Sequence, residues 1–253
     1  MTSQPADAET ALVGNVTAGI VRVGDTVRRP VGPWTASVDA LLRHLHEVGF
    51  TAAPRPLGRD EAGRQVLEYV PGEVGDPTGT YPPADLAAIG RLLRDYHDAL
   101  ADFVPPSPAV WNELIPPDAE ELVCHNDAAP WNLIRSARGW VLIDWDAAAP
   151  GSRLWDLAYS AQSMAGLHAA RTPDDAADRL RIFVDGYGLD SARRSALAAL
   201  LGRRARAMYD LLHAGDRDQR QPWARIWTED GPYWRETAEY LDTHRDQWTT
   251  ALR

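Results

Sequence analysis

The sequence predicts an α+β fold made of two unequal lobes. Short β-rich segments and one amphipathic helical segment occupy the start of the chain, whereas the residues from Trp155 onward have almost only helical periodicity. A loop rich in glycine and proline, over residues 71–83, separates the two kinds of pattern. We therefore expect a smaller N-terminal lobe over residues 1–72 and a larger C-terminal lobe over residues 73–253.

The N-terminal lobe is expected to begin with a β-hairpin. Residues 20–23 and 26–29 are β-rich and flank Gly24-Asp25, a pair typical of tight hairpin turns. Residues 34–48 then place apolar side chains on one face of a helix. Residues 64–70 are the next expected strand, because they are apolar and end at a proline-glycine pair.

The C-terminal lobe should be mainly helical, with short strands near the junction. Apolar residues between positions 86 and 100 follow a helical repeat, and the segments LVCH, NLI and GWVLIDW are short and apolar, as buried strands are. Farther along, Thr172 before a proline and Asp190 before a serine are typical helix starts.

Composition excludes several classes of protein. The 253 residues contain 45% hydrophobic and 25% charged side chains, as ordinary globular proteins do. No stretch approaches the roughly 20 apolar residues of a membrane span, and the first residues lack a secretory signal pattern, so we expect a cytoplasmic protein. A net charge of −10 disfavours nucleic acid and anionic membranes as partners and favours cationic ones.

Two further features of the composition limit the chemistry. The single cysteine, Cys124, agrees with a reducing compartment and leaves oxygen atoms as the ligands for any metal. All 26 basic side chains are arginines, which excludes Schiff-base lysines, the phosphate-binding lysine of P-loops and the usual lysine of protein kinases.

The segment LVCHNDAAPWNLI, followed by GWVLIDWD, contains residues suited to phosphoryl transfer. His125, Asp127 and Asn132 are spaced as H-x-D-x-x-x-x-N, and Asp144 ends an apolar strand twelve residues later. A loop carboxylate such as Asp127 can orient a hydroxyl and take its proton, while Asn132 and Asp144 offer oxygen ligands to Mg²⁺. The alternative is an ordinary turn in which Asp144 only caps a strand. We assign His125 a structural role, holding the loop through its neutral imidazole.

These motifs resemble those of the aminoglycoside phosphotransferase and choline kinase family, which has a bilobal protein-kinase-like fold. The resemblance rests on CHNDAAPWNLI and LIDWDAAAPGSRLWDLA, and more loosely on VLEYVPGE and GNVTAGIVRVGDTVRRP. It implies a small-molecule kinase that uses ATP or GTP with Mg²⁺, with Asp127 as catalytic base and with Asn132 and Asp144 as metal ligands. It also implies supporting roles for Asp146, through water, and for Asp156, which would brace the catalytic loop.

The resemblance also implies where the nucleotide binds. Backbone groups near Glu68 and Val70, between the lobes, would pair with the base. Asn15 and Thr17 would belong to the loop over the phosphates, although the four residues from Gly14, taken alone, favour an ordinary turn.

An arginine is expected to replace the lysine that usually holds the phosphates. Arg28 best matches that position, and Arg29 would face the other side of the strand because side chains alternate. Asp39, on the following helix, is the nearest candidate for the acidic partner of Arg28.

The acceptor is expected to be a small, cationic molecule such as an aminoglycoside, an amino sugar or a related metabolite or antibiotic. Carboxylates attract a cation and aromatic faces bind it. Candidates for both are Asp210, Trp223, Trp227, Glu229, Asp230 and Trp234. Aromatic residues at helical spacing are more often core, and acidic residues between them are more often solvated, so the structural alternative is somewhat favoured.

A second function from another class is a kinase-like protein that binds a nucleotide or metabolite with little or no catalysis. The missing lysine and the scarcity of glycine near Gly14 favour it. Phosphorylation of a protein is disfavoured, because no A-P-E signature is present. The choice of ATP or GTP, the acceptor, the oligomeric state and a role in resistance or in biosynthesis stay open at this point.

Overall fold

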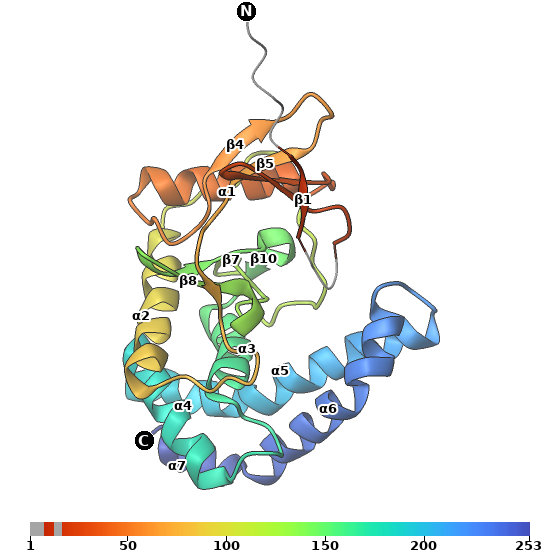
Figure 1. The fold of residues 1–253 in the computed structure, drawn as a ribbon. Coiled ribbons are helices and arrows are strands. Elements are labelled where there is room, and N and C mark those ends of the chain that lie inside the picture. Colours follow the sequence, from red (N-terminus) through yellow and green to blue (C-terminus); the bar gives the residue numbers. More distant parts are fainter. Residues whose placement is uncertain (1–7, 13–16) are drawn as a thin grey trace, which may run out of the picture.

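The computed structural model describes residues 8–12 and 17–253. An antiparallel sheet and one helix lie above a junction of short strands, and helices form most of the chain below it (Figure 1). The predicted α+β class, β-rich first and helical afterwards, is confirmed. None of the helices in this part of the chain combines the length and the hydropathy that crossing a membrane requires.

The upper sheet has five antiparallel strands in the order β1-β2-β3-β5-β4. Their bounds are Thr10–Ala11 for β1, Val21–Val23 for β2, Thr26–Arg29 for β3, Pro56–Arg59 for β4 and Gln65–Glu68 for β5. The predicted hairpin is confirmed, since β2 and β3 pair around Gly24, whose φ of 58° suits glycine. The sequence does not predict β4, because proline and glycine are rare inside strands; β4 lies at the sheet edge and contains an irregularity.

Helix α1 (Thr35–Glu47) packs against this sheet and confirms the helix predicted over residues 34–48. Its leucines at positions 41, 42 and 45 are completely buried. The helix also contacts the short 3₁₀ helix η2 (Trp145–Ala147), which belongs to the lower part of the molecule. α1 therefore helps to set the position of the sheet over the junction.

Short strands form the junction. β6 (Glu73–Val74), β8 (Leu133–Ser136) and β9 (Gly139–Leu142) make one small sheet, and β7 (Leu122–Cys124) pairs with β10 (Ala149–Gly151). The 3₁₀ helix η1 (Pro130–Asn132) directly precedes β8. The division of the chain at residues 72 and 73 stays a prediction; β6 begins at Glu73 and pairs with β8 of the lower part.

Six helices complete the lower part: α2 (Pro83–Ala99), α3 (Arg153–Ala165), α4 (Pro173–Tyr187), α5 (Ser191–Arg217), α6 (Trp223–Thr243) and α7 (Arg245–Ala251). Ser152, Thr172 and Asp190 cap α3, α4 and α5 by accepting a backbone N–H three residues on. The helix starts predicted at Thr172 and Asp190 are confirmed. α5 and α6 pack together as a long hairpin that extends to one side (Figure 1).

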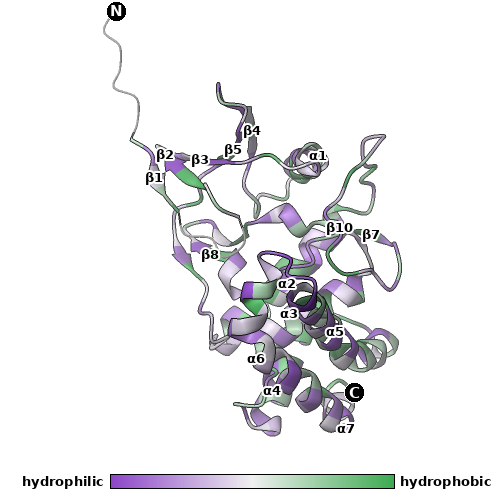
Figure 2. Ribbon diagram, turned by 90° about the vertical axis from the view of Figure 1, so that its right-hand side faces the viewer, coloured by the Kyte–Doolittle hydropathy of each residue, from purple (hydrophilic) through white to green (hydrophobic). Residues whose placement is uncertain are grey.

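The core lies between these helices and the junction strands. Its largest completely buried side chains include Tyr96, Trp145, Tyr159 and Phe183. Figure 2 shows hydrophobic and hydrophilic residues on the same helices, as expected for amphipathic helices around a shared core.

Helices α2 and α4 approach each other closely at two glycines. A Cβ on Gly90 would lie 2.3 Å from the carbonyl oxygen of Phe183, and one on Gly186 would lie 2.3 Å from that of Ala87. Only glycine allows the two backbones to come this near.

We expect Gly90→Ala to lower the free energy of unfolding by about 1–3 kcal/mol, because the added methyl group forces the helices apart. Gly202→Ala is the matched control, since the nearest atom to its Cβ would be the movable carboxylate of Asp242. That variant should be neutral, or more stable by up to about 1 kcal/mol from helix propensity. Urea unfolding measures both; equal losses in the two proteins would contradict the close packing.

Candidate active site

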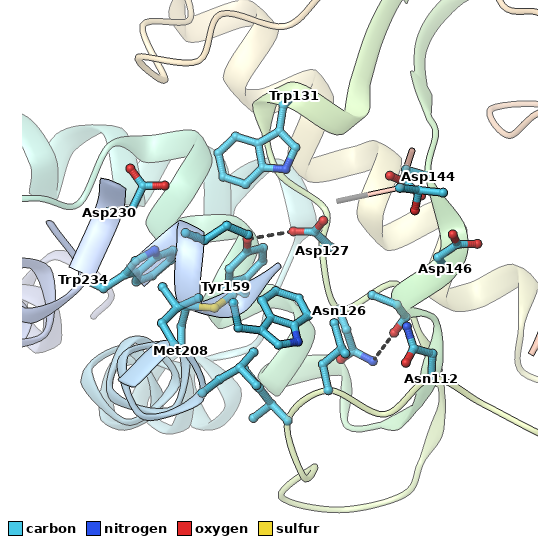
Figure 3. A pocket seen from close by; sticks show the side chains of 18 of the residues that line it. Asn112, Asn126, Asp127, Trp131, Asp144, Asp146, Tyr159, Met208, Asp230 and Trp234 are labelled. Atoms are coloured by element: carbon cyan, nitrogen blue, oxygen red, sulfur yellow. Dashed lines mark hydrogen bonds between the residues drawn. The ribbon is translucent and has the colours of Figure 1, made fainter. Parts of the chain in front are cut away.

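Asp127 lies on the loop between β7 and η1, with both carboxylate oxygens held. Oδ1 accepts a hydrogen bond of 2.7 Å from the Tyr159 hydroxyl (Figure 3). Oδ2 accepts one of 2.8 Å from Asn132 Nδ2. Asn132 Nδ2 also donates to the Asp127 carbonyl oxygen at 2.9 Å. Burial raises the pKa of Asp127. The arrangement fixes the rotamer of this carboxylate before any ligand binds.

The loop is held from below by Asp156, a completely buried residue near the start of α3. Its carboxylate accepts the backbone N–H groups of His125 and Asn126 at 3.1 and 2.8 Å, and it bonds His97 Nε2 at 3.1 Å. Burial opposes ionisation, but these bonds and the His97 charge hold the pKa of Asp156 below its usual value. An ionised aspartate is therefore the form that braces this loop.

His125 is also buried, and its ring bonds backbone groups on both sides. Nε2 lies 3.1 Å from the Ile143 carbonyl oxygen, and Nδ1 accepts the Asp127 backbone N–H at 3.3 Å. The ring packs against Trp145, with centroids 4.6 Å apart. These contacts tie the loop that contains Asp127 to the strand end that precedes Asp144.

Asp144 follows β9 in the left-handed region, at φ 59° and ψ 74°. This conformation is unfavourable for a residue with a Cβ, and such strain concentrates at functional sites. The Ile143 backbone N–H donates to the Asn132 carbonyl oxygen at 2.9 Å, so the segments of Asn132 and Asp144 are joined directly. Asp127 and Asp144 line the same cavity.

The two arginines at the end of β3 face opposite sides of the strand, as predicted. The sequence analysis, however, expects Arg28 to face the site, and the structure places Arg29 there. Arg29 is buried and donates to Asp144 Oδ1 at 3.0 Å and to Asp146 Oδ2. Arg28 instead faces away, with Nε 3.6 Å from Asp60 Oδ2. The arginine beside Asp144 and Asp146 is therefore Arg29 and not the predicted Arg28, and a phosphate-binding role stays a prediction. Strand alternation separates two faces, but it does not tell which face the lower lobe covers.

The acidic partner expected for Arg28 is engaged elsewhere. Asp39 on α1 forms an ion pair of 2.7 Å with Arg59 and accepts a hydrogen bond of 2.6 Å from Gln65. The carboxylates that neutralise Arg29 come from the segment after β9 and not from α1.

Asp146 completes this side of the site. Besides Arg29, it accepts hydrogen bonds from the side chains of Trp34 and Thr17. Burial, opposed by Arg29, raises the pKa of Asp146. Thr17 lines the cavity, whereas Asn15 lies outside the described residues.

The residues proposed for the base-binding hinge lie between the upper sheet and the junction. Val70 packs with Ile134 and Val141. The Glu68 carboxylate forms an ion pair of 2.8 Å with Arg138, on the turn between β8 and β9. A nucleotide-binding role for Glu68 and Val70 stays a prediction.

Asn132 and Asp144 carry the oxygen atoms that would hold a magnesium ion, and this role stays a prediction. Because Asn132 Nδ2 is used by Asp127, its Oδ1 is the atom left for a cation. The carboxylate of Asp144 is 37% exposed and the cavity is open to it, so phosphate oxygens can complete the coordination. These are hard oxygen ligands of the kind that Mg²⁺ prefers.

A different cluster in the described chain also has metal-ligating side chains, namely His97, Cys124 and Asp156. Each of them already has hydrogen-bond partners. His97 Nδ1 bonds Tyr187 at 2.8 Å, and Cys124 Sγ donates to the Ser152 carbonyl oxygen at 3.3 Å. We interpret this cluster as the buried support of the loop.

The cavity beside Asp127 has a volume of about 220 Å³ and extends between the loop and the α5–α6 hairpin. Four of the predicted acceptor residues line it: Trp223, Glu229, Asp230 and Trp234. In Figure 3, Asp230 and Trp234 lie on the far side of Asp127 from Asp144 and Asp146.

Two predicted acceptor residues lie outside the cavity. Asp210 is exposed. The positions of α5 that line the cavity are 204, 208, 211 and 212, which follow the helical repeat. Asp210 comes two residues after position 208, and this step turns its side chain to another side of the helix. Trp227 turns toward α5, where its ring packs against Tyr209 and His213. These ring contacts agree with the alternative in which Trp227 packs between helices and does not bind the acceptor.

Sequence reasoning missed several lining residues. Asn112, Leu114 and Ile115 come from the irregular segment after α2, where no periodic pattern exists. Arg204 had a signal that we did not use: it is a charged residue on the buried stripe of α5 that includes Leu197, Leu201 and Leu212.

Comparison with known proteins gives independent evidence on the family of this chain. Residues 107–197 match the model of the phosphotransferase enzyme family. The trifolitoxin immunity protein of Rhizobium leguminosarum bv. trifolii is 34% identical over 204 residues, which are 74% of this chain and 76% of the relative. The chain belongs to the phosphotransferase enzyme family. The predicted family is thus confirmed, and with it the expectation of a phosphotransferase.

Solved structures show the same fold for this phosphotransferase. A choline/ethanolamine kinase family protein from Mesorhizobium loti has a TM-score of 0.67 at 16% identity, covering 99% of this chain and 93% of that one. An amicoumacin kinase bound to AMP-PNP and Ca²⁺ has a TM-score of 0.65 at 13% identity, covering 93% and 88%. The predicted kinase-like fold is confirmed.

We expect Asp156→Ala to lower the free energy of unfolding of the phosphotransferase by about 3–5 kcal/mol, because it leaves buried partners without an acceptor. Asp178→Ala is the control, since Asp178 forms an exposed pair with Arg181 and should contribute at most about 1 kcal/mol. Denaturant unfolding compares the two variants; a small loss for Asp156→Ala would contradict the bracing role.

Proposed function

We propose that this phosphotransferase transfers the γ-phosphoryl group of ATP or GTP to a hydroxyl group of a small molecule. The observation that carries the proposal is the shared cavity of Asp127 and Asp144, with Asn132 bonded to the segments of both. A turn with a strand cap, the alternative at the sequence level, gives no reason for these carboxylates to meet.

In this proposal Asp127 is the catalytic base. The acceptor hydroxyl donates a hydrogen bond to the Asp127 carboxylate, which takes the proton as the hydroxyl oxygen bonds to the γ-phosphorus. The bond from that phosphorus to the bridging oxygen breaks, and the nucleoside diphosphate leaves with this oxygen. Tyr159 and Asn132 hold the carboxylate in place, so little reorganisation is needed when the acceptor arrives. The raised pKa of Asp127 makes it a better proton acceptor than an exposed aspartate.

Asn132 and Asp144 would hold Mg²⁺, with Asp146 in support. Bound there, the ion would neutralise the negative charge of the phosphate groups. Arg29, and not Arg28, would steady the phosphates, because its guanidinium lies against Asp144 and Asp146 and can make a bidentate contact with phosphate. The backbone at Glu68 and Val70 would pair with the base, and Thr17 would lie near the phosphates.

We propose an antibiotic or a related metabolite as the acceptor, with a cationic group. The immunity protein among the relatives supports a protective role. Asp230 supports the cationic group: it lines the cavity beside Trp234, and burial and the nearby Glu229 raise the pKa of Asp230. A cation bound at this end would relieve that repulsion.

We expect Asp127→Ala to reduce turnover at least about a hundredfold while nucleotide binding stays nearly intact. Asp144→Ala should remove the magnesium-dependent part of nucleotide binding. The measurements are nucleotide consumption in a screen of amino sugars, nucleosides and peptide antibiotics, and thermal stabilisation by ATP with and without Mg²⁺.

Asp210→Ala is the control for both, because Asp210 is an exposed acid outside the cavity. Equal activity in all these proteins would refute the assignment. Binding of Mg²⁺ and ATP without consumption for any acceptor would favour the non-catalytic alternative.

The two neighbouring arginines allow a separate test of phosphate binding. Arg29→Gln should weaken the binding of magnesium and AMP-PNP about ten- to a hundredfold, as expected for loss of a charged hydrogen-bond donor. Arg28→Gln makes the same chemical change on the opposite face of β3 and should leave the affinity within about twofold. Titration calorimetry measures both; a larger effect at Arg28 would restore the original assignment.

A further inference from the structure

Arg204, on α5, is a buried cation with too few partners. The side chain is only 2% exposed, and Nη2 donates a hydrogen bond to the Asn126 carbonyl oxygen at 3.2 Å. Its Nε and Nη1 atoms are buried and have no hydrogen-bond partner among the residues that the structure describes. A buried guanidinium normally uses most of its five N–H groups, so this one has unused capacity.

No carboxylate within residues 8–12 and 17–253 forms an ion pair with Arg204. The guanidinium lies instead over two aromatic rings, 4.6 Å from the centre of Tyr159 and 5.4 Å from that of Trp155. Burial lowers the pKa of Arg204, which indicates that the nearby negative charges do not compensate fully for lost hydration. Such a residue is costly to keep unless a ligand completes its contacts.

Arg204 also lies close to the reacting centre. It lines the same cavity as Asp127, and the carbonyl that it bonds belongs to the residue before Asp127. Tyr159, whose ring it covers, donates to Asp127. A group that bonds Arg204 therefore sits near the hydroxyl that Asp127 activates.

We propose that Arg204 determines acceptor specificity by binding a carboxylate or amide carbonyl oxygen carried close to the reacting hydroxyl. This inference rests on the proposed function and narrows the acceptor class. A cationic group next to the hydroxyl, as in choline, is disfavoured by the guanidinium. The cation expected at Asp230 belongs at the other end of the acceptor.

The remaining walls fit an apolar body between these two ends. Met208, Leu212 and Ile226 line the cavity together with Trp223 and Trp234. The proposed acceptor is thus an amphipathic molecule. One end carries the hydroxyl and an oxygen that accepts a hydrogen bond, the middle is apolar, and the other end is cationic or polar.

Three probes of one chain length test the oxygen acceptor: 3-hydroxyoctanoate, 3-hydroxyoctanamide and octane-1,3-diol. Binding to the full chain is measured by titration calorimetry without nucleotide, so the result does not depend on turnover. We expect the acid or the amide to bind about ten- to a hundredfold more tightly than the diol, as a charged donor would produce. Whichever is tighter identifies carboxylate or carbonyl as the preferred group.

Arg204→Met, of similar size, should remove that preference and leave the affinity for the diol unchanged. Arg204→Lys should retain part of the preference for the acid, which keeps the test usable if the methionine variant does not fold. Arg203→Met is the matched control, because Arg203 is the exposed neighbour on the same helix and its variant should keep the preference.

Equal affinities for the three probes, including no measurable binding of any of them at millimolar concentration, would overturn the inference. So would an equal loss for all probes in Arg204→Met, which would indicate a structural role. The proposed function fails separately, if Asp127→Ala and Asp144→Ala behave like the unchanged protein.

Discussion

The buried carboxylate of Asp156 is the interaction on which the site depends. It accepts two consecutive backbone N–H groups of the loop that leads to Asp127 and bonds His97 on α2, so three separate segments meet at one side chain. A charge in this position is stable only when its hydrogen bonds are satisfied, and here they are. The loop is therefore set by the core of the lower lobe before any substrate binds.

Hydrogen bonds connect the loop that Asp156 supports to the groups that we propose to react. His125 joins the loop to the end of β9, Asn132 bonds both the backbone and the side chain of Asp127, and Tyr159 holds the remaining carboxylate oxygen. Preorganisation of this kind lowers the cost of reaching the reactive geometry. The opposite wall, built by α5 and α6, contributes apolar side chains together with Arg204, to which we assign acceptor recognition in our proposal.

Local patterns were enough to predict much of the fold. The hairpin around Gly24, the helix over residues 34–48 and the helix starts at Thr172 and Asp190 all follow from turn chemistry, periodicity and capping, which act over a few residues. β4 did not follow, because its proline and glycine are acceptable only at the edge of a sheet, and an edge is a tertiary property. Asp127, Asn132 and Asp144 could be selected because their residue types and spacing match one chemistry.

The sequence by itself determined the class of fold, the absence of lysine and the set of oxygen-bearing side chains around the proposed magnesium site. Only the tertiary structure decided which arginine enters the site, since alternation along β3 is the same for Arg28 and Arg29 until the lower lobe covers one face. It also decided that Trp227 packs against Tyr209 and His213 of α5 while Trp234 lines the cavity, because helix packing selects among similar residues by their angle around the axis. The residue types that a reaction needs can be found in a short segment of the sequence, whereas tertiary packing decides in which direction each side chain points.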